Sequence, residues 1–248
     1  MRVEGLAVML RPRSPYEACD LGLALVRHHA RSLWRCFAPV LLAVALLAMC
    51  AVEVADWLPV FLIFWLKPWM DRTLLFVLSR AVFGQATHWS DLWAARRMVW
   101  GGQFFRTLLW RRFSPWRAYT QPIEQLEGQT GSRRRKRTTL MLKDNRGAAT
   151  ALQVAFAHAE AVLLYGLLGL VWWMAPEDSR NQVMDWLLHL GNEEGRAVIK
   201  DLLTAGIYTA VVLFLEPFYV AAGFAMYLNR RVALEAWDVE QEFRRAFA

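Results

Sequence analysis

Residues 213–231 read LFLEPFYVAAGFAMYLNRR, an apolar run that contains the carboxylate Glu216 and the helix breaker Pro217 and ends in two arginines. Such a run suits the hydrocarbon core of a membrane. An ionised carboxylate is costly there, so it pairs with a cation, takes up a proton or faces water. Proline removes one helical hydrogen bond and leaves a carbonyl one turn earlier without its donor. The stretch therefore predicts a membrane-spanning helix that is broken at Pro217 and packs against a polar interior.

Apolar residues are gathered in blocks along the whole chain. The 248 residues are 56% hydrophobic and include 13 tryptophans, and the mean hydropathy is +0.22. A soluble domain is nearer to half apolar, with dispersed apolar residues, whereas a helical span needs about 20 mostly apolar residues. We therefore expect an all-α polytopic membrane protein with about four spans, two of them broken at Pro68 and Pro217, plus amphipathic interfacial helices. The spans are predicted over residues 36–54, 57–83, 152–174 and 202–228.

The expected organisation is a single integral membrane domain, residues 1–248. Its parts are a cytoplasmic amphipathic helix, a first helical hairpin, a basic cytoplasmic interfacial segment, a second helical hairpin and a cytoplasmic tail, at residues 1–35, 36–84, 85–150, 151–229 and 230–248. Residues 1–13 have no apolar core, so we expect no cleaved signal peptide.

The charge distribution predicts orientation. The net charge is +7. Residues 96–146 hold thirteen Lys and Arg against three acids, while residues 177–196 hold five acids against two arginines. Short basic loops stay in the cytoplasm, so both termini are expected there. The acidic Glu53 and Asp56 mark an external turn. The basic balance is thus a topology signal, and we expect no nucleic-acid partner.

A helix is predicted over residues 15–34. Ser14 is a suitable N-cap and Pro15 suits the first helical position. The helix is amphipathic and basic, so it lies either on the inner membrane surface or against other cytoplasmic parts. The three cysteines, Cys19, Cys36 and Cys50, have spacings that fit neither a metal site nor a disulfide framework. We interpret them as small buried apolar residues.

Aromatic and basic residues alternate over residues 90–112, which predicts an interfacial helix, and residues 114–131 are expected to be irregular. RRRKR at residues 133–137 either holds anionic lipid or only fixes its loop inside the cell. The predicted anionic-lipid contacts are Arg96, Arg97, Arg111, Arg112, Arg133, Arg134, Arg135, Lys136 and Arg137.

Two stretches match each other: FWLKPWMDRTLLFVLSR at residues 64–80 and LFLEPFYVAAGFAMYLNR at residues 213–230. Each has Leu, a charged residue, Pro and an aromatic, followed by an apolar run that ends in Arg. They suggest a weak parallel repeat. The matched charges are opposite, so we expect an intramembrane polar cluster of Lys67, Asp71, Arg72 and Glu216 between the two broken helices. The cluster either fixes helix register or forms a ligand or ion site.

Sequence motifs of catalysis are absent. There is no P-loop, dinucleotide-binding turn, His-Glu-x-x-His or nucleophile elbow, and the five histidines are scattered. We therefore expect no catalytic residues, no cofactor, no metal and no enzymatic activity.

SPYEACDLGLALVRHHARSLWR at residues 14–35 resembles the entry motif of a group of uncharacterised bacterial integral inner-membrane proteins. That group is related to the membrane domain associated with some glycerophosphodiester phosphodiesterases. KPWMDRTLLFVLSRAVFG, QPIEQLEG and YLNRRVALEAWDVE, at residues 67–84, 121–128 and 227–240, are similar to further blocks of its members. The resemblance implies a helical protein of the bacterial inner (plasma) membrane without phosphodiesterase chemistry, which belongs to a separate soluble domain.

Two functions follow as hypotheses. The first is a non-enzymatic membrane subunit or scaffold that binds anionic lipid and a membrane or cytoplasmic partner protein, or that forms a homo-oligomer. The second is a small transporter or channel component whose polar site lies between the broken helices. An enzyme that acts on lipids is least favoured. The scaffold predicts central charges that are sealed in pairs, while the transporter predicts charges that face a cavity.

Overall fold

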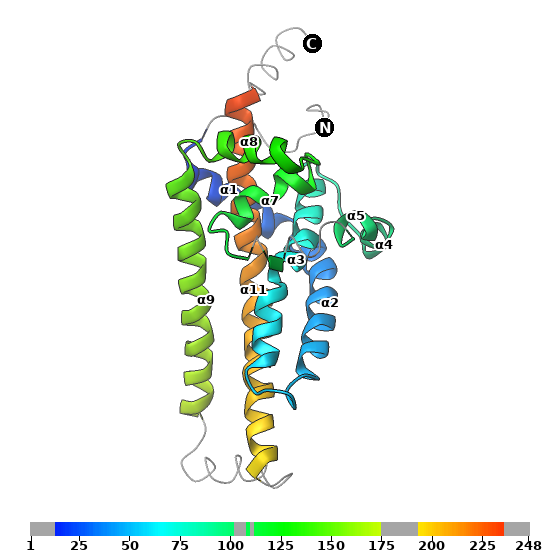
Figure 1. Cartoon of the computed structure of the whole chain (residues 1–248), viewed down its shortest axis with the longest axis vertical. Coiled ribbons are helices and arrows are strands. Elements are labelled where there is room, and N and C mark those ends of the chain that lie inside the picture. Colours follow the sequence, from blue (N-terminus) through cyan, green and yellow to red (C-terminus); the bar gives the residue numbers. More distant parts are fainter. Residues whose placement is uncertain (1–12, 102–107, 110–111, 175–192, 236–248) are drawn as a thin grey trace.

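The fold is a bundle of long, roughly parallel helices with shorter helices gathered near one end (Figure 1). It is known from a computed structural model that describes residues 13–101, 108–109, 112–174 and 193–235. Regular secondary structure within those ranges is entirely helical, as expected. The helices are α1 Pro15–His28, α2 Ala30–Met49, α3 Leu58–Ala81, α4 Trp89–Ala94, α5 Arg96–Val99, α7 Arg117–Gln125, α8 Gly131–Leu142, α9 Arg146–Met174 and α11 Glu193–Glu235.

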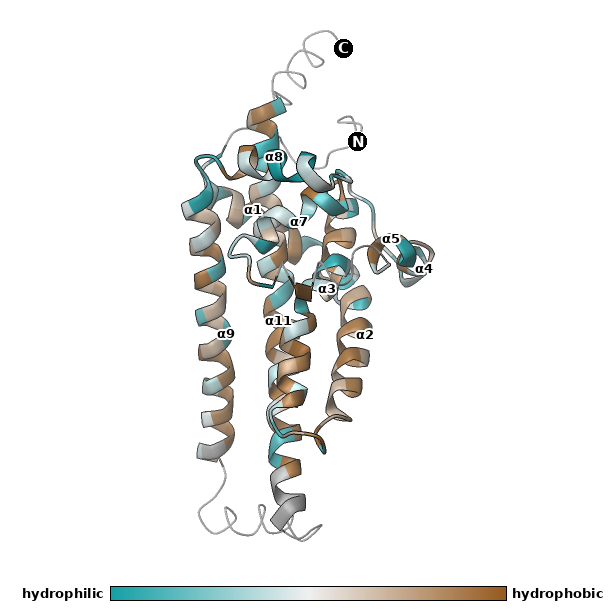
Figure 2. Cartoon of the chain, viewed as in Figure 1, coloured by the Kyte–Doolittle hydropathy of each residue, from teal (hydrophilic) through white to brown (hydrophobic). Residues whose placement is uncertain are grey.

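Three of the described helices are long and apolar enough to cross a membrane: Ala30–Met49, Arg146–Val171 and Val198–Glu235. Helix α3 is not among them, so the expected count of four spans is not confirmed. Apolar residues dominate α2 and α9, while hydrophilic residues gather at the end of the bundle that carries α8 (Figure 2). This division is typical of a protein with one face in a membrane and one in water.

The predicted breaks at Pro68 and Pro217 are not seen, since α3 and α11 each continue through their proline. For Pro217 the structure supplies a reason. Proline leaves the carbonyl of the residue four positions earlier without its helical donor, which here is Leu213. The indole N–H of Trp34 donates to that carbonyl at 3.1 Å. Trp34 of α2 thus supplies the hydrogen bond that Pro217 removes, which stabilises the continuous helix.

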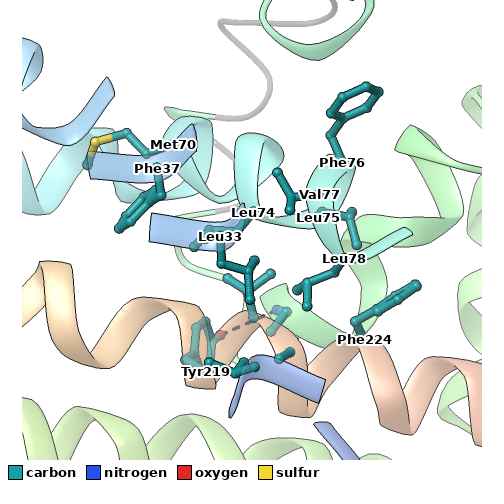
Figure 3. Close-up of a cluster of buried hydrophobic side chains, with 14 of the residues drawn as sticks. Leu33, Phe37, Met70, Leu74, Leu75, Phe76, Val77, Leu78, Tyr219 and Phe224 are labelled. Atoms are coloured by element: carbon teal, nitrogen blue, oxygen red, sulfur yellow. Dashed lines mark hydrogen bonds between the residues drawn. The ribbon is translucent and has the colours of Figure 1, made fainter. Parts of the chain in front are cut away.

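The core lies where α2, α3 and α11 meet (Figure 3). Leu33 and Phe37 of α2, Leu74 and Leu78 of α3, and Phe224 of α11 are fully or almost fully buried. Helix α3 is buried around most of its circumference from Met70 to Leu78, because neighbouring helices cover it on several sides.

Helix α1 starts as predicted: Ser14 is its N-cap, and the Glu17 N–H donates to Ser14 Oγ at 3.2 Å. It ends at His28, and α2 begins at Ala30, six residues before the predicted span. Helix α1 packs on α11, within the stretch predicted as the fourth span, so neither of the two positions expected for it is confirmed. At Gly22 an added Cβ would lie 2.5 Å from the carbonyl oxygen of Ala221 on α11, so the two backbones touch.

Several local predictions are wrong. The segment at residues 114–131, expected to be irregular, contains α7, and the loop expected around residues 133–137 is helix α8. The interfacial helix expected over residues 90–112 is divided into α4 and α5, and part of it lies outside the described residues. Of the three cysteines, Cys36 is buried, but Cys19 is half-buried and Cys50 is exposed. Cys50 is exposed because it follows α2 at the turn toward α3.

Helix α9 stands apart from α2 and α3 (Figure 1), and its main contacts are with α11. Large apolar side chains along it are open, including Val162, Tyr165 and Leu170. None of its span-forming window is buried by protein. Such a surface suits lipid, which would cover the helix in a membrane.

Candidate functional site

Helix α7 is short, polar and almost completely enclosed. Every residue from Arg117 to Glu124 is buried. A glycine on α11 makes room for it, since a Cβ at Gly223 would lie 2.4 Å from the Cβ of Ala118. The first turn of the helix is also tied to α11, because the N–H of Ala118 donates to Tyr219 Oη at 3.3 Å. This close approach carries the Arg117 side chain into the centre of the bundle.

Five charged side chains meet at that centre, and we name them the central charge network: Lys67, Asp71, Arg117, Glu160 and Glu216. Lys67 Nζ lies 2.6 Å from Glu216 Oε2 and 2.7 Å from Glu160 Oε2. Arg117 bridges Glu216 and the third acid, with Nη2 2.8 Å from Glu216 Oε1 and Nε 3.0 Å from Asp71 Oδ2. Four helices, α3, α7, α9 and α11, are thereby joined through ion pairs.

The network is closed to solvent. Side-chain exposure is 6% or less for Lys67, Asp71, Arg117 and Glu216, and 18% for Glu160. The free space among these residues is about 10 Å³, which is room for about one water molecule. Tyr208 covers the most exposed member by donating its hydroxyl to Glu160 Oε1 at 2.6 Å. The arrangement can hold helices together, but it leaves no room for a ligand.

Neighbouring charges keep the guanidinium of Arg117 ionised. Burial alone would lower the pKa of Arg117, but Asp71, Tyr219 and Glu216 together raise the pKa of Arg117 above its ordinary value. Arg112 is affected in the opposite direction. Burial, and then the charge of Arg117, lower the pKa of Arg112 to about 10. Both side chains are still cationic at neutral pH.

Of the four residues predicted to form the polar cluster, the structure brings Lys67, Asp71 and Glu216 together, next to Pro68 and Pro217. It does not bring Arg72 into this group. Arg72 points the other way, where Nη1 lies 3.9 Å from Glu124 Oε1 and Nη2 donates to the carbonyl of Met98 at 3.1 Å. Its Nε also donates to the carbonyl of Val99. Arg72 thus binds the carboxyl end of α5, where a cation is favourable.

Arg117 and Glu160 are the members that sequence reasoning missed. Glu160 carried a weak signal, because it is a carboxylate within an otherwise apolar helix. Arg117 carried none, since it is one arginine among many in a basic segment.

The residues predicted to contact anionic lipid fall into two groups. Arg96, Arg97, Arg133, Arg135 and Lys136 are exposed, and no ion pair joins any of them to another described residue. The remaining predicted residues either contact other side chains of the protein or lie outside the described residues. Arg112 lies over the ring of Phe64, 3.3 Å from its centroid, and Arg134 Nε is 3.5 Å from Glu124 Oε2. Arg111 lies outside the described residues.

Arg137 belongs to a second ion-pair cluster, which ties α8 to the end of α11. Its Nε lies 2.9 Å from Glu127 Oε2, and its Nη2 contacts Glu235. Arg231 Nη2 is 2.6 Å from Glu235 Oε2, and Tyr227 donates its hydroxyl to Glu127 Oε1 at 2.6 Å. In the basic run on α8, Arg134 and Arg137 therefore form ion pairs within the protein, while Arg133, Arg135 and Lys136 are exposed.

Within the part of the chain that the structure describes, no group of three or more His, Cys, Asp and Glu side chains is placed to hold a metal ion. Comparisons with protein-family models, curated proteins and solved structures found no match to the chain.

Proposed function

We propose that the chain is a non-enzymatic integral protein of a bacterial inner membrane, which serves as a scaffold for anionic lipid and a partner protein. Helix α3 is its fourth span, both ends of the chain face the cytoplasm, and the end that carries α8 is the cytoplasmic surface. The observation that carries the proposal is a contrast in charge pairing. Charges in the bundle centre are paired with one another, whereas Arg133, Arg135 and Lys136 on α8 stand open.

Helix α3 fits the role of a fourth span because of its neighbours. It is 24 residues long, or about 36 Å at 1.5 Å per residue, and so it can cross a hydrocarbon core of about 30 Å. Its Lys67 and Asp71 are paired with groups from other helices. Charges inside a membrane are tolerated when they face the bundle interior and pair there.

The transporter hypothesis receives less support. It predicted that the central charges face a watery cavity, while the space beside them measures about 10 Å³. Lys67→Cys and Glu216→Cys, each introduced into the chain that keeps Cys50, distinguish the two functions. The scaffold predicts slow modification by a membrane-impermeant thiol reagent at both positions, compared with the exposed Cys50 of the same protein. Modification at either position as fast as that of Cys50 would favour transport.

The lipid function is tested by charge removal on α8. Each basic residue near a surface contributes about 1 kcal/mol to binding of anionic lipid. Replacing Arg133, Arg135 and Lys136 together by Gln should therefore weaken that binding about 100-fold. Native mass spectrometry of gently extracted protein would count bound phosphatidylglycerol and any stoichiometric partner. Lys200→Gln, an exposed site toward the opposite end of α11, is the control and should bind as the wild type does.

Equal lipid binding by the triple variant and the wild type would contradict the proposed lipid surface. A partner subunit that stays bound to the wild-type protein would support the scaffold. A homo-oligomer that carries only a small ion would contradict it.

A further inference from the structure

A second basic site lies away from α8, in a hollow of about 910 Å³ between the junction of α1 and α2 and the loop that leads from α3 into α4. Its charged and titratable lining consists of His28, His29, Arg31, Arg35 and His88. The volume falls in the range of small-molecule sites, about 300–1,000 Å³.

The lining of this hollow carries positive charge without compensation. No Asp or Glu lines it, and neither Arg31 nor Arg35 forms an ion pair with a described residue. These two arginines are one helical turn apart on α2, where like charges repel. The acid next to the site, Asp91, is already engaged, because its Oδ2 lies 3.4 Å from Arg80 Nη2 and accepts the N–H of His88 at 3.0 Å. An anion in the hollow would relieve the repulsion.

An unused hydroxyl provides an independent indication of a ligand. Thr87 is 3% exposed and lines the hollow, and its Oγ1 has no hydrogen-bond partner among the described residues. Its backbone is held firmly, since Ser32 Oγ donates to the Thr87 carbonyl at 2.7 Å and accepts the Thr87 N–H at 2.9 Å. A buried polar group that lacks a partner is costly. The Thr87 hydroxyl therefore lacks an acceptor, which a ligand that enters from the hollow could supply.

The position of the hollow indicates which anion it takes. Arg31 and Arg35 lie on the first turns of α2, one of the three span-forming helices, and so at the level of lipid headgroups. Trp89 of the lining is 41% exposed, and Trp93, on the same short helix α4, is 54% exposed. Tryptophan is enriched at this interface. Helix α4 projects to one side of the bundle (Figure 1), where its tryptophans can enter the bilayer surface.

We propose that this hollow binds the phosphate-bearing headgroup of an anionic phospholipid. Arg31 and Arg35 donate charge-assisted hydrogen bonds to the phosphate oxygens, Thr87 donates its free hydroxyl, and Trp89 packs beside the glycerol. The inference rests on the proposed membrane embedding and lipid binding, but it uses none of the cations of α8.

The test uses the full-length protein in nanodiscs of phosphatidylcholine with a small fraction of phosphatidylglycerol, and native mass spectrometry counts the phosphatidylglycerol that is retained. Arg31→Gln/Arg35→Gln should weaken retention about 30-fold, at about a factor of five per cation. Thr87→Val, which keeps the shape of the side chain, should weaken it about tenfold. Arg27→Gln/Lys200→Gln removes the same charge outside the hollow and should retain lipid as the wild type does.

The outcomes separate this inference from the proposed function. If the α8 triple variant loses lipid while Arg31→Gln/Arg35→Gln retains it, the hollow is not a lipid site and the proposed function stands. If only the hollow variants lose lipid, the inference is supported and the α8 surface is contradicted. If inorganic phosphate binds the protein in pure phosphatidylcholine discs and phosphatidylglycerol does not compete, the site takes a soluble phosphate, and the headgroup proposal is overturned.

Discussion

The central charge network makes a sharp prediction about Lys67. Within it two cations, Lys67 and Arg117, face three carboxylates, Asp71, Glu160 and Glu216. Lys67→Met leaves Arg117 alone against all three. Removing one partner of a buried ion pair costs about 3–5 kcal/mol, because the remaining charge is left without compensation. We therefore expect Lys67→Met to lower the free energy of unfolding by about 3–5 kcal/mol.

Glu216→Gln should cost less. It leaves two cations and two carboxylates, so charge is balanced, although two hydrogen bonds to cations become weaker, at about 1–3 kcal/mol in total. Lys67→Met/Glu216→Gln removes a contacting pair and leaves Arg117 against two carboxylates, Asp71 and Glu160, instead of three. Residues in direct contact couple by about 0.5–3 kcal/mol. The double variant should therefore be more stable than Lys67→Met alone, and its loss should be smaller than the sum of the single losses by about 2 kcal/mol.

The assay is denaturant-induced unfolding in mixed micelles, followed by the fluorescence of the 13 tryptophans. Lys200→Met, an exposed lysine toward the far end of α11, controls for the loss of a positive charge and should change stability by less than about 0.5 kcal/mol. Losses at positions 67 and 216 that add to within about 0.5 kcal/mol would refute the ion pair between Lys67 and Glu216.

Other predictions concern packing and cysteine chemistry. Gly223→Ala forces a Cβ to within 2.4 Å of the Ala118 Cβ and should destabilise the protein by about 1–3 kcal/mol in the same assay. Gly166→Ala places a Cβ with nothing within 4 Å and should not destabilise it. Equal effects of the two substitutions would contradict the close contact between α7 and α11. On intact cells, a membrane-impermeant maleimide should modify the exposed Cys50 and leave Cys36 unmodified, whereas labelling of Cys50 only after lysis would reverse the topology. Burial, and then Asp20, raise the pKa of Cys19 to about 11. In a variant with Cys19 alone, the labelling rate should therefore rise about tenfold per pH unit from pH 7 to 9, because the thiolate is the reactive form. A rise of only about threefold between pH 8 and 9 would show an ordinary thiol with a pKa of about 8.5.

The long helices could be predicted from the sequence because their signal is local. Apolar blocks of sufficient length specify α2, α9 and α11, and Ser14 followed by Pro15 specifies the start of α1. The proximity of Lys67 and Glu216 could be anticipated as well, since two opposite charges beside two prolines each need a polar neighbour. The parallel repeat that suggested this match remains a prediction.

Helix α7 could not be predicted, because its surroundings come from elsewhere in the chain. It has nine residues, with Pro122 among them, and most of its side chains are buried whether polar or not. Its apolar residues Ala118, Tyr119, Pro122 and Ile123 do recur at helical spacing, but the stretch is short and contains a proline, and the burial of its polar face depends on distant parts of the chain. Arg117 pairs with Asp71 and Glu216, which lie 46 and 99 positions away from it in sequence. The hydrogen bond that stabilises α11 at Pro217 could not be predicted either, because its donor, Trp34, lies far away in sequence.

The charged residues of α3 pair with residues that are synthesised much later, and this order has a consequence for biosynthesis. Lys67 leaves the ribosome 149 residues before Glu216, which corresponds to roughly 7–30 s at synthesis rates of about 5–20 residues per second. During that interval α3 carries charges that hydrocarbon does not tolerate alone. Its partners are made in the order Arg117, Glu160 and Glu216, so the charges of α3 are fully compensated only when α11 arrives. In the proposed four-span topology, a chain that stops before α11 keeps the pairs Lys67–Glu160 and Asp71–Arg117 but lacks Glu216, the carboxylate that joins the two pairs.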